Sequence, residues 1–87
     1  MEIKIEIPQY YPGEGIEYNW VDGFVIEAKA ESGMINIIAN KEGLISLATH
    51  LLTLAQNQVP QGSHLHYDEH NSLEENSFNL IIQKKIK

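Results

Sequence analysis

The chain has 87 residues and a net charge of −6, with twelve carboxylates against six lysines and no arginine. Its length suits one domain, residues 1–87, and its hydrophobic content of 43% is that of a folded protein. Nucleic-acid binders carry a basic patch, and arginine is the preferred residue for phosphate contacts. We therefore do not expect direct nucleic-acid binding.

Other absent features narrow the class of protein further. Without cysteine the chain has no disulfide framework and no thiolate metal site. The N-terminal sequence MEIKIEIP alternates charge with isoleucine, whereas a signal peptide has a basic head followed by an apolar run. No stretch reaches the roughly 18 apolar residues of a membrane span. We therefore expect a cytoplasmic protein with no membrane association.

Short apolar patterns in the first forty residues predict four strands: 3–7, 16–20, 24–30 and 34–39. Asp22-Gly23 lies between the second and third of these stretches, which is a strong hairpin signal. Glu31-Ser32-Gly33 predicts a second tight turn. Because the fourth stretch is apolar on both faces, we expect it in the centre of a sheet or beside a helix.

Residues 40–58 have the period of an amphipathic helix. One stripe of this helix is apolar: Leu44, Leu47, Ala48, Leu51, Leu52 and Ala55. The opposite side is polar: Ser46, Thr49, His50, Thr53, Gln56 and Asn57. We therefore expect the leucines in the core and the polar side chains, His50 included, in solvent. Asn40 is a favourable N-cap, and Gly43 in the first turn suggests close approach of a neighbouring strand.

Two more strands are predicted after the helix, at 64–68 and 77–83. In the first, Leu65 and Tyr67 alternate with His64, His66 and Asp68, so we expect the first pair inward and the other three outward. The expected fold is therefore α+β. A single antiparallel sheet of about six strands, in the order β-β-β-β-α-β-β, would carry the helix on one face.

The outward residues His64, His66 and Asp68 carry the clearest chemical signal. Residues at this spacing share one face of a strand, with neighbours ~6.6 Å apart. Two imidazoles and a carboxylate so placed are typical ligands for a divalent metal such as zinc or iron. The alternative is a polar strand face whose histidines bond to backbone or to a partner. No complete set of catalytic residues accompanies them.

The second half of the chain resembles the immunity protein 32 family of polymorphic toxin systems. The resemblance rests on EGLISLATHLLTLA (42–55), VPQGSHLHYDE (59–69) and the closing Ser77–Ile82 strand. It covers residues 42–82, and its most specific element is the His-x-His segment behind the helix. Asn76 stands where the family pattern has glycine before the last strand. The resemblance implies an α+β fold and a role in neutralising a toxin.

Three functional hypotheses follow. The first is a protein-binding module for a basic toxin domain, because the chain is acidic overall. The module would contact the toxin through His64, His66, Tyr67 and Asp68. Trp20 would be a second aromatic anchor beside Tyr67. The second is a metal-binding protein or metal-dependent enzyme that uses His64, His66 and Asp68. The third is a structural domain without catalytic activity. Free sheet edges also allow a homodimer.

Overall fold

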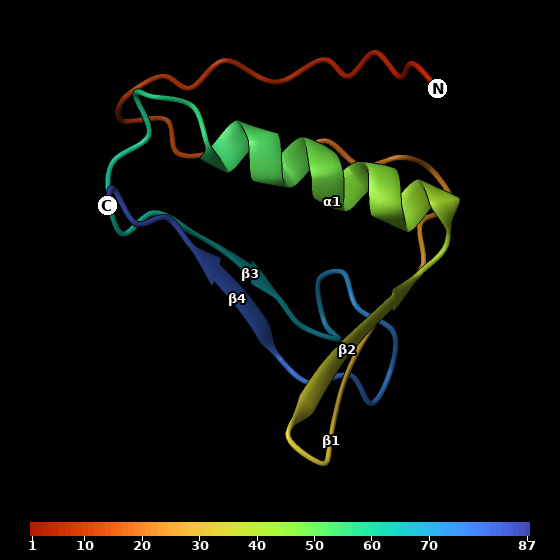
Figure 1. Cartoon of the computed structure of the whole chain (residues 1–87). Helices are drawn as coiled ribbons and strands as arrows, with labels where there is room; N and C mark the ends of the chain where they lie inside the picture. Colours follow the sequence, from red (N-terminus) through yellow and green to blue (C-terminus); the bar gives the residue numbers. More distant parts are fainter.

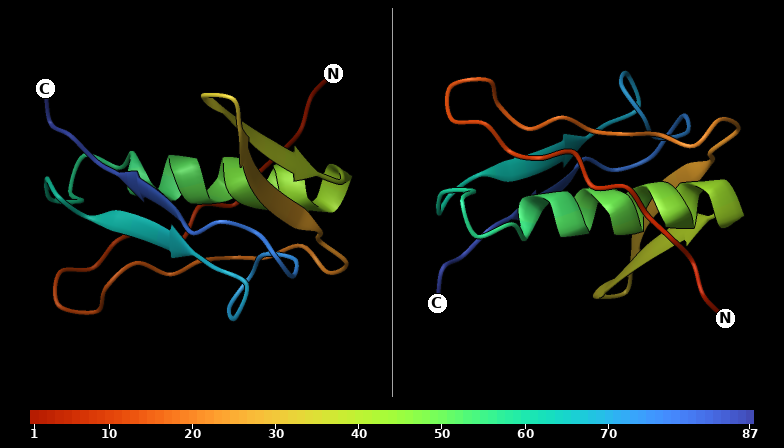
Figure 2. Two further views of the ribbon diagram at one scale, coloured as in Figure 1. Left: turned by 90° about the horizontal axis from the view of Figure 1, so that it is seen from below. Right: turned by 90° about the horizontal axis from the view of Figure 1, so that it is seen from above.

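The computed structural model describes all 87 residues, and it contains one helix and four strands (Figure 1). In chain order these are β1 (Ile26–Glu31), β2 (Met34–Ala39), α1 (Lys41–Leu54), β3 (His64–Tyr67) and β4 (Leu80–Gln83). The strands form two separate antiparallel hairpins, β1–β2 and β3–β4. Seen from below, both hairpins lie in front of α1, and seen from above, the N-terminal segment crosses α1 on its other side (Figure 2).

The α+β class is confirmed, but the single six-stranded sheet is wrong. The predicted strand at 34–39 forms β2 with the same bounds, and the one at 24–30 forms β1 with slightly shifted bounds. The predicted strands at 64–68 and 77–83 are shortened to β3 and β4. Residues 3–7 and 16–20 form no strand. The chain turns at Asp22-Gly23 as predicted, but no strand precedes this turn, so it closes no hairpin.

The β1–β2 hairpin is closed by the turn that the sequence predicts. Glu31 and Met34 face each other in the register, with Ser32 and Gly33 between them. Both turn residues have positive φ, 49° for Ser32 and 78° for Gly33. Two residues of positive φ match the right-handed twist of the flanking strands, which explains why this short connection closes the hairpin.

Side chains of the helix region explain why residues 16–25 do not join a sheet. The backbone N–H of Val21 donates to Ser46 Oγ (2.9 Å), and that of Val25 donates to Asn40 Oδ1 (2.9 Å). The carbonyl of Asn19 accepts from His50 Nε2 (2.8 Å). Backbone groups that strand pairing would satisfy are thus satisfied by α1 and its N-cap, so this segment lies along the helix as irregular chain.

The helix is turned the opposite way from the prediction. Ser46, Thr49, His50 and Thr53 are buried, whereas Leu44, Leu51 and Leu52 remain 55%, 46% and 50% exposed. The three hydroxyls donate to the carbonyl four residues earlier, for example Thr53 Oγ1 to Thr49 O (2.7 Å). Each buried hydroxyl therefore has a partner within its own helix, which removes much of the cost of burying it.

Gly43 fits the close approach that its position suggests. A Cβ atom there would lie 2.6 Å from the carbonyl oxygen of Val25 and 2.9 Å from Cγ1 of Ile26. Asn40 caps the helix as predicted, since its Oδ1 accepts from the N–H of Gly43 (2.8 Å). The first turn of α1 is therefore fitted against the start of β1, and only glycine leaves room for that contact.

The hydrophobic core lies between α1 and the two hairpins, and it is small. Its buried members come from β1, the end of α1, the following loop, β3 and the β3–β4 connection: Ile26, Ala28, Leu54, Val59, Leu65, Tyr67 and Leu73. On the far side of α1, Gln56 holds the N-terminal segment by bonds to Pro8 O (2.9 Å) and Tyr10 N (3.2 Å). The one helix lacks the length and apolar run that a bilayer crossing requires.

Candidate functional site

The β3–β4 hairpin presents one face to the core and the other to solvent. Leu65 and Tyr67 are buried, whereas His64 and His66 are exposed, as the alternation predicts. In the register His64 lies opposite Gln83 and His66 opposite Ile81, and directly opposed residues share a face. Ile81 is 59% exposed. The outer β3–β4 face is therefore made of His64, His66, Ile81 and Gln83.

The structure brings His66 and Asp68 together and leaves His64 apart. His66 Nε2 lies 3.6 Å from Asp68 Oδ2. The other oxygen of Asp68 accepts from the N–H groups of His70 (2.9 Å) and Asn71 (3.0 Å), so this carboxylate also organises the turn after β3. His64 Nδ1 donates instead to the carbonyl of Gly62 (3.4 Å).

The described side chains include no group of three or more histidines and carboxylates placed to hold a metal ion. His66 and Asp68 are one pair, and the Asp68 oxygen that faces the turn is already engaged by backbone donors. The metal site of His64, His66 and Asp68 stays a prediction, which elemental analysis of untagged protein would test.

Trp20 and Tyr67, the two predicted aromatic anchors, pack inside the molecule around His50. Tyr67 is 1% exposed, and its hydroxyl lies 2.8 Å from His50 Nδ1. Trp20 is half-buried and meets the His50 ring edge-on, with centroids 4.4 Å apart. The Tyr67 ring is therefore enclosed in this conformation, whereas the Trp20 ring keeps part of its surface accessible.

His50 is held as a neutral imidazole. A carbonyl oxygen only accepts, so Nε2 carries the proton that it donates to Asn19 O, and Nδ1 accepts from the Tyr67 hydroxyl. Burial lowers the pKa of His50 below its ordinary value of 6.5, against a smaller rise from the Asn19 hydrogen bond. Burial likewise raises the pKa of Tyr67, and the nearby Tyr18 adds to that rise. The sequence analysis placed His50 in solvent, and the structure corrects this.

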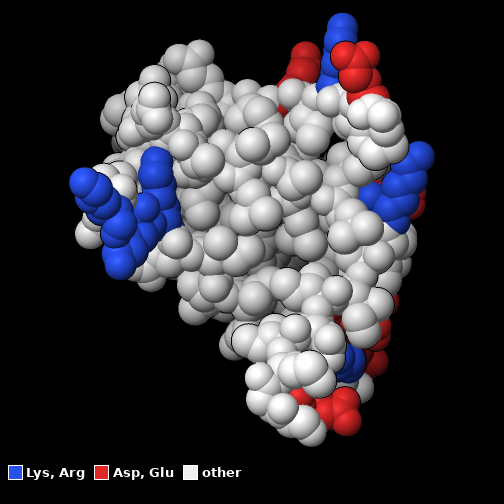
Figure 3. Space-filling model, in the orientation of Figure 1, with Lys and Arg blue, Asp and Glu red and all other residues white.

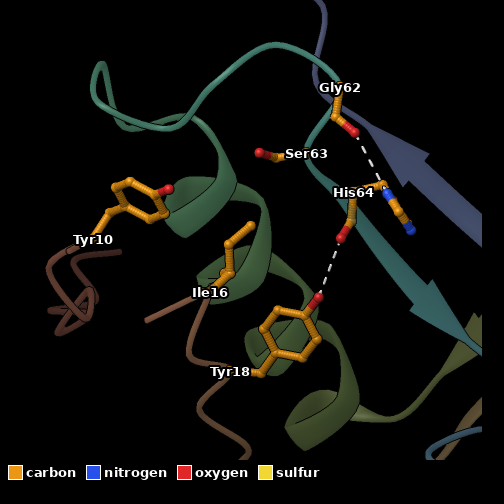
Figure 4. Close-up of a pocket in the computed structure, with 7 residues that line it drawn as sticks. Tyr10, Ile16, Tyr18, Gly62, Ser63 and His64 are labelled. Carbon is orange, nitrogen blue, oxygen red and sulfur yellow. Dashed lines mark hydrogen bonds between the residues drawn. The ribbon is translucent and has the colours of Figure 1, made fainter. Parts of the chain in front are cut away.

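A shallow hollow of about 420 Å³ lies beside the start of β3 (Figure 4). It is lined by Tyr10, Gly15, Ile16 and Tyr18 from the N-terminal segment and by residues 62–64. The Tyr18 hydroxyl points to the main chain of His64 and donates to its carbonyl oxygen (3.3 Å). The imidazole of His64 points away from Tyr18 in this view. The hollow thus lies between the irregular N-terminal segment and β3, and His66 is not among its lining residues.

The connection between β3 and β4 carries the acidic side chains nearest to these histidines. Glu69, Glu74 and Glu75 are exposed on it. Glu69 Oε2 accepts from the N–H of Asn76 (2.9 Å), and its other oxygen lies 3.9 Å from His70 Nε2. Glu74 and Glu75 lie at a turn before β4. A negatively charged turn therefore precedes β4.

Ile81 was not among the predicted site residues, although it lies on the surface beside the histidines. The sequence does contain a signal for it, because alternation along a strand places Ile81 on the opposite face from Leu80 and Ile82. The exposure of the α1 leucines was not predicted either, and hydrophobic periodicity gives no signal for it, since periodicity shows that two faces differ and not which one is buried.

Comparison with known proteins gives one match. The sequence model of the family described as Immunity protein 32 matches residues 35–85, which include β2, α1, β3 and β4 almost entirely. No curated protein and no solved structure matches the chain.

Proposed function

The chain belongs to the immunity protein 32 family, and we propose from this membership that it neutralises a toxin by binding directly to it as one domain of residues 1–87. The observation that carries the proposal is the extent of the match, which covers more than half of the chain. An immunity protein acts by occupying a surface of its toxin, so the relevant chemistry is recognition by exposed side chains.

The outer β3–β4 face is the contact that we propose. His66 and Ile81 lie opposite each other on it, so an apolar side chain adjoins a hydrogen-bonding one. Such mixed patches suit the centre of a protein interface. His64 and Asp68 extend the contact on either side of His66. Tyr67 is buried beneath this face and does not belong to the contact, and Trp20 packs against His50 instead of lying on this face.

The acidic turn favours a basic partner. Glu74 and Glu75 are exposed, and neither carboxylate makes an ion pair within the chain. Unpaired surface carboxylates attract a positively charged surface and speed its encounter. A toxin domain with a basic surface around its own active site would match both the charge of this turn and the net charge of −6.

Co-expression with a candidate toxin tests the proposal. We expect a complex that co-purifies without crosslinking and that protects cells from the toxin. A toxin that remains lethal in the presence of the folded protein, with no complex by size-exclusion chromatography, would contradict the proposal.

A matched pair of variants tests the contact itself. Ile81→Lys adds a positive charge and a longer side chain to the outer β3–β4 face, and it should weaken toxin binding roughly a hundredfold or more, because like charges and lost apolar contact both oppose association. Ile35→Lys makes the same change on β2 and should leave toxin affinity unchanged. Equal affinities for both variants and the unaltered protein would place the toxin contact elsewhere.

A further inference from the structure

The strand β2 has one edge without a partner, unlike β1. The outer edge of β1 is covered by the β3–β4 connection, since Ile26 O accepts from Glu74 N (2.9 Å) and Ala28 O accepts from Phe78 N (2.8 Å). The strand β2 pairs with β1 alone. Natural proteins rarely leave an apolar edge strand open, because such an edge is a template for another strand.

The register identifies which backbone groups are free. In an antiparallel pair, alternate residues exchange backbone hydrogen bonds, and the remaining ones point their N–H and C=O groups outward. Glu31 and Met34 flank the two-residue turn, and Asn40 N donates to Val25 O (3.1 Å), so the even-numbered residues of β2 face β1. The N–H and C=O groups of Ile35 and Ile37 therefore point away from the hairpin.

The side chains of this edge are uncharged, and all except Asn36 are apolar. Met34, Ile35, Ile37 and Ile38 are exposed, and Ile35 is 74% accessible. In Figures 1 and 2, β2 lies on the same side of the molecule as β4, in front of β1 and β3. The space-filling view of that side shows no charged side chain over its middle, and the charges lie at the periphery (Figure 3).

The total exposed surface of the chain is large enough to include an interface. The chain has an accessible surface of 6413 Å², whereas a folded monomer of its mass, 9.9 kDa, exposes about 5,200 Å². The excess is roughly 1,200 Å², and a partner in an interface of standard size contributes about 800 Å². The chain therefore has enough surplus surface for one such interface.

We propose that a second copy of this chain covers the face by pairing its β2 antiparallel to β2 of the first, about a two-fold axis at Asn36. Ile35 of each copy then exchanges backbone hydrogen bonds with Ile37 of the other. Ile35 and Ile37 of both copies gather on one side of the joined sheet, and the two Asn36 amides meet on the other, between Met34 and Ile38 of each copy. Both copies use the same surface, as a two-fold interface requires.

Charge favours a second copy over the toxin as the occupant. A basic partner is attracted to carboxylates, and residues 34–39 contain none. Two copies that each carry −6 repel each other least where neither has a charge. Antiparallel pairing of the two β2 strands places no like charges of β2 opposite each other. It also leaves the outer β3–β4 face free, so the proposal does not depend on the toxin interaction.

The experiment is a mass measurement by light scattering on the untagged full chain over a concentration series. We expect the unaltered protein to have twice the chain mass. Ile35→Lys places lysines within the interface and should raise the dimer dissociation constant roughly a hundredfold or more. The matched variant Ile81→Lys should remain dimeric. Circular dichroism checks that both variants keep their fold.

Hydrogen exchange gives a second readout on the unaltered protein. The Ile35 and Ile37 amides should exchange slowly in the dimer and quickly on dilution, while the Asn36 amide, bonded to β1, should change little. A monomer at all concentrations would overturn the proposal. A dimer that persists in Ile35→Lys would also overturn it, as would a dimer in which the Ile35 and Ile37 amides exchange quickly. In both cases the two copies would meet at a different surface.

Discussion

At the scale of single residues, His50 shows how this protein buries a titratable group. The imidazole is fully enclosed, and in its neutral form Nε2 donates to Asn19 O while Nδ1 accepts from the Tyr67 hydroxyl. Protonation would place a charge among Trp20, Tyr18 and Tyr67, and the Tyr67 hydroxyl would have to become an acceptor. The neutral state of His50 is therefore part of the fold.

This state makes stability depend on pH. Burial lowers the pKa of His50 in the folded protein, so the unfolded chain takes up a proton at higher pH than the folded one. Stability from neutral His50 is then complete above about pH 6.5 and is lost as the pH falls from there through the folded pKa, with a slope of at most about 1.4 kcal/mol per pH unit.

Urea unfolding at a series of pH values from 8 to 5 measures this slope. The variant His70→Gln is the control, because His70 is exposed and its removal should leave the slope unchanged. A free energy of unfolding that is constant across pH 6.5 would contradict the assignment of His50 as a buried neutral group.

At the scale of elements, α1 shows that a polar helix face can be the buried one. Ser46 and Thr53 return their hydroxyl protons to the helix backbone, and Ser46 also accepts from Val21 N. Small side chains at Gly43 and Ser46 let the preceding segment lie close to the helix axis. Leucine side chains would be too large for that contact, and Leu44, Leu51 and Leu52 face outward.

The orientation of α1 predicts an unusual pattern of stability. Ser46→Leu should lower the free energy of unfolding by roughly 2–4 kcal/mol, because it overfills a packed contact and leaves Val21 N without its acceptor. Leu52→Ser should change it by about 0.5 kcal/mol or less, because Leu52 is half exposed.

Chemical denaturation of the two variants at pH 7.5 compares them directly. The conventional interpretation of the periodicity, with leucines buried, expects the reverse order. A larger loss in Leu52→Ser than in Ser46→Leu would show that α1 is turned the other way.

The sequence predicts those elements whose conformation is determined by residues close to them in the chain. The turn at Ser32 and Gly33, the cap at Asn40 and the alternation around His66 were all evident from neighbouring residues. The strands at 3–7 and 16–20 were not, because their fate depends on helix side chains such as Ser46 that satisfy backbone groups from a distance. For the candidate site, alternation placed the two histidines outward, but it could not show that Trp20 is held inside by His50.

At the scale of the whole molecule, charged and uncharged surfaces are separated. The acidic turn with Glu74 and Glu75 follows β3, whereas the side of the molecule that carries the outer edge of β2 has an uncharged middle (Figure 3). The proposed toxin contact and the proposed contact between two copies thus use surfaces of different charge. The two contacts should therefore respond differently to salt, since screening acts on exposed charges and not on apolar contact.

The association rate with a basic toxin provides the measurement at this scale. Screening shortens the electrostatic range from about 30 Å at 0.01 M salt to about 3 Å at 1 M, so the association rate constant should fall tenfold or more over that range. The dissociation rate should change much less. Stopped-flow fluorescence resolves the two rates.

Two variants that each lose two carboxylates separate local from net charge. Glu74→Gln with Glu75→Gln should flatten the salt dependence, because it removes charge beside the outer β3–β4 face. The double variant Glu2→Gln with Glu6→Gln removes the same amount of charge from the N-terminal segment, which lies on the far side of α1 from the hairpins. This variant should alter the salt dependence of the association rate little. Equal effects of the two variants would mean that net charge alone steers the encounter. An association rate that is insensitive to salt would remove the acidic turn from the mechanism.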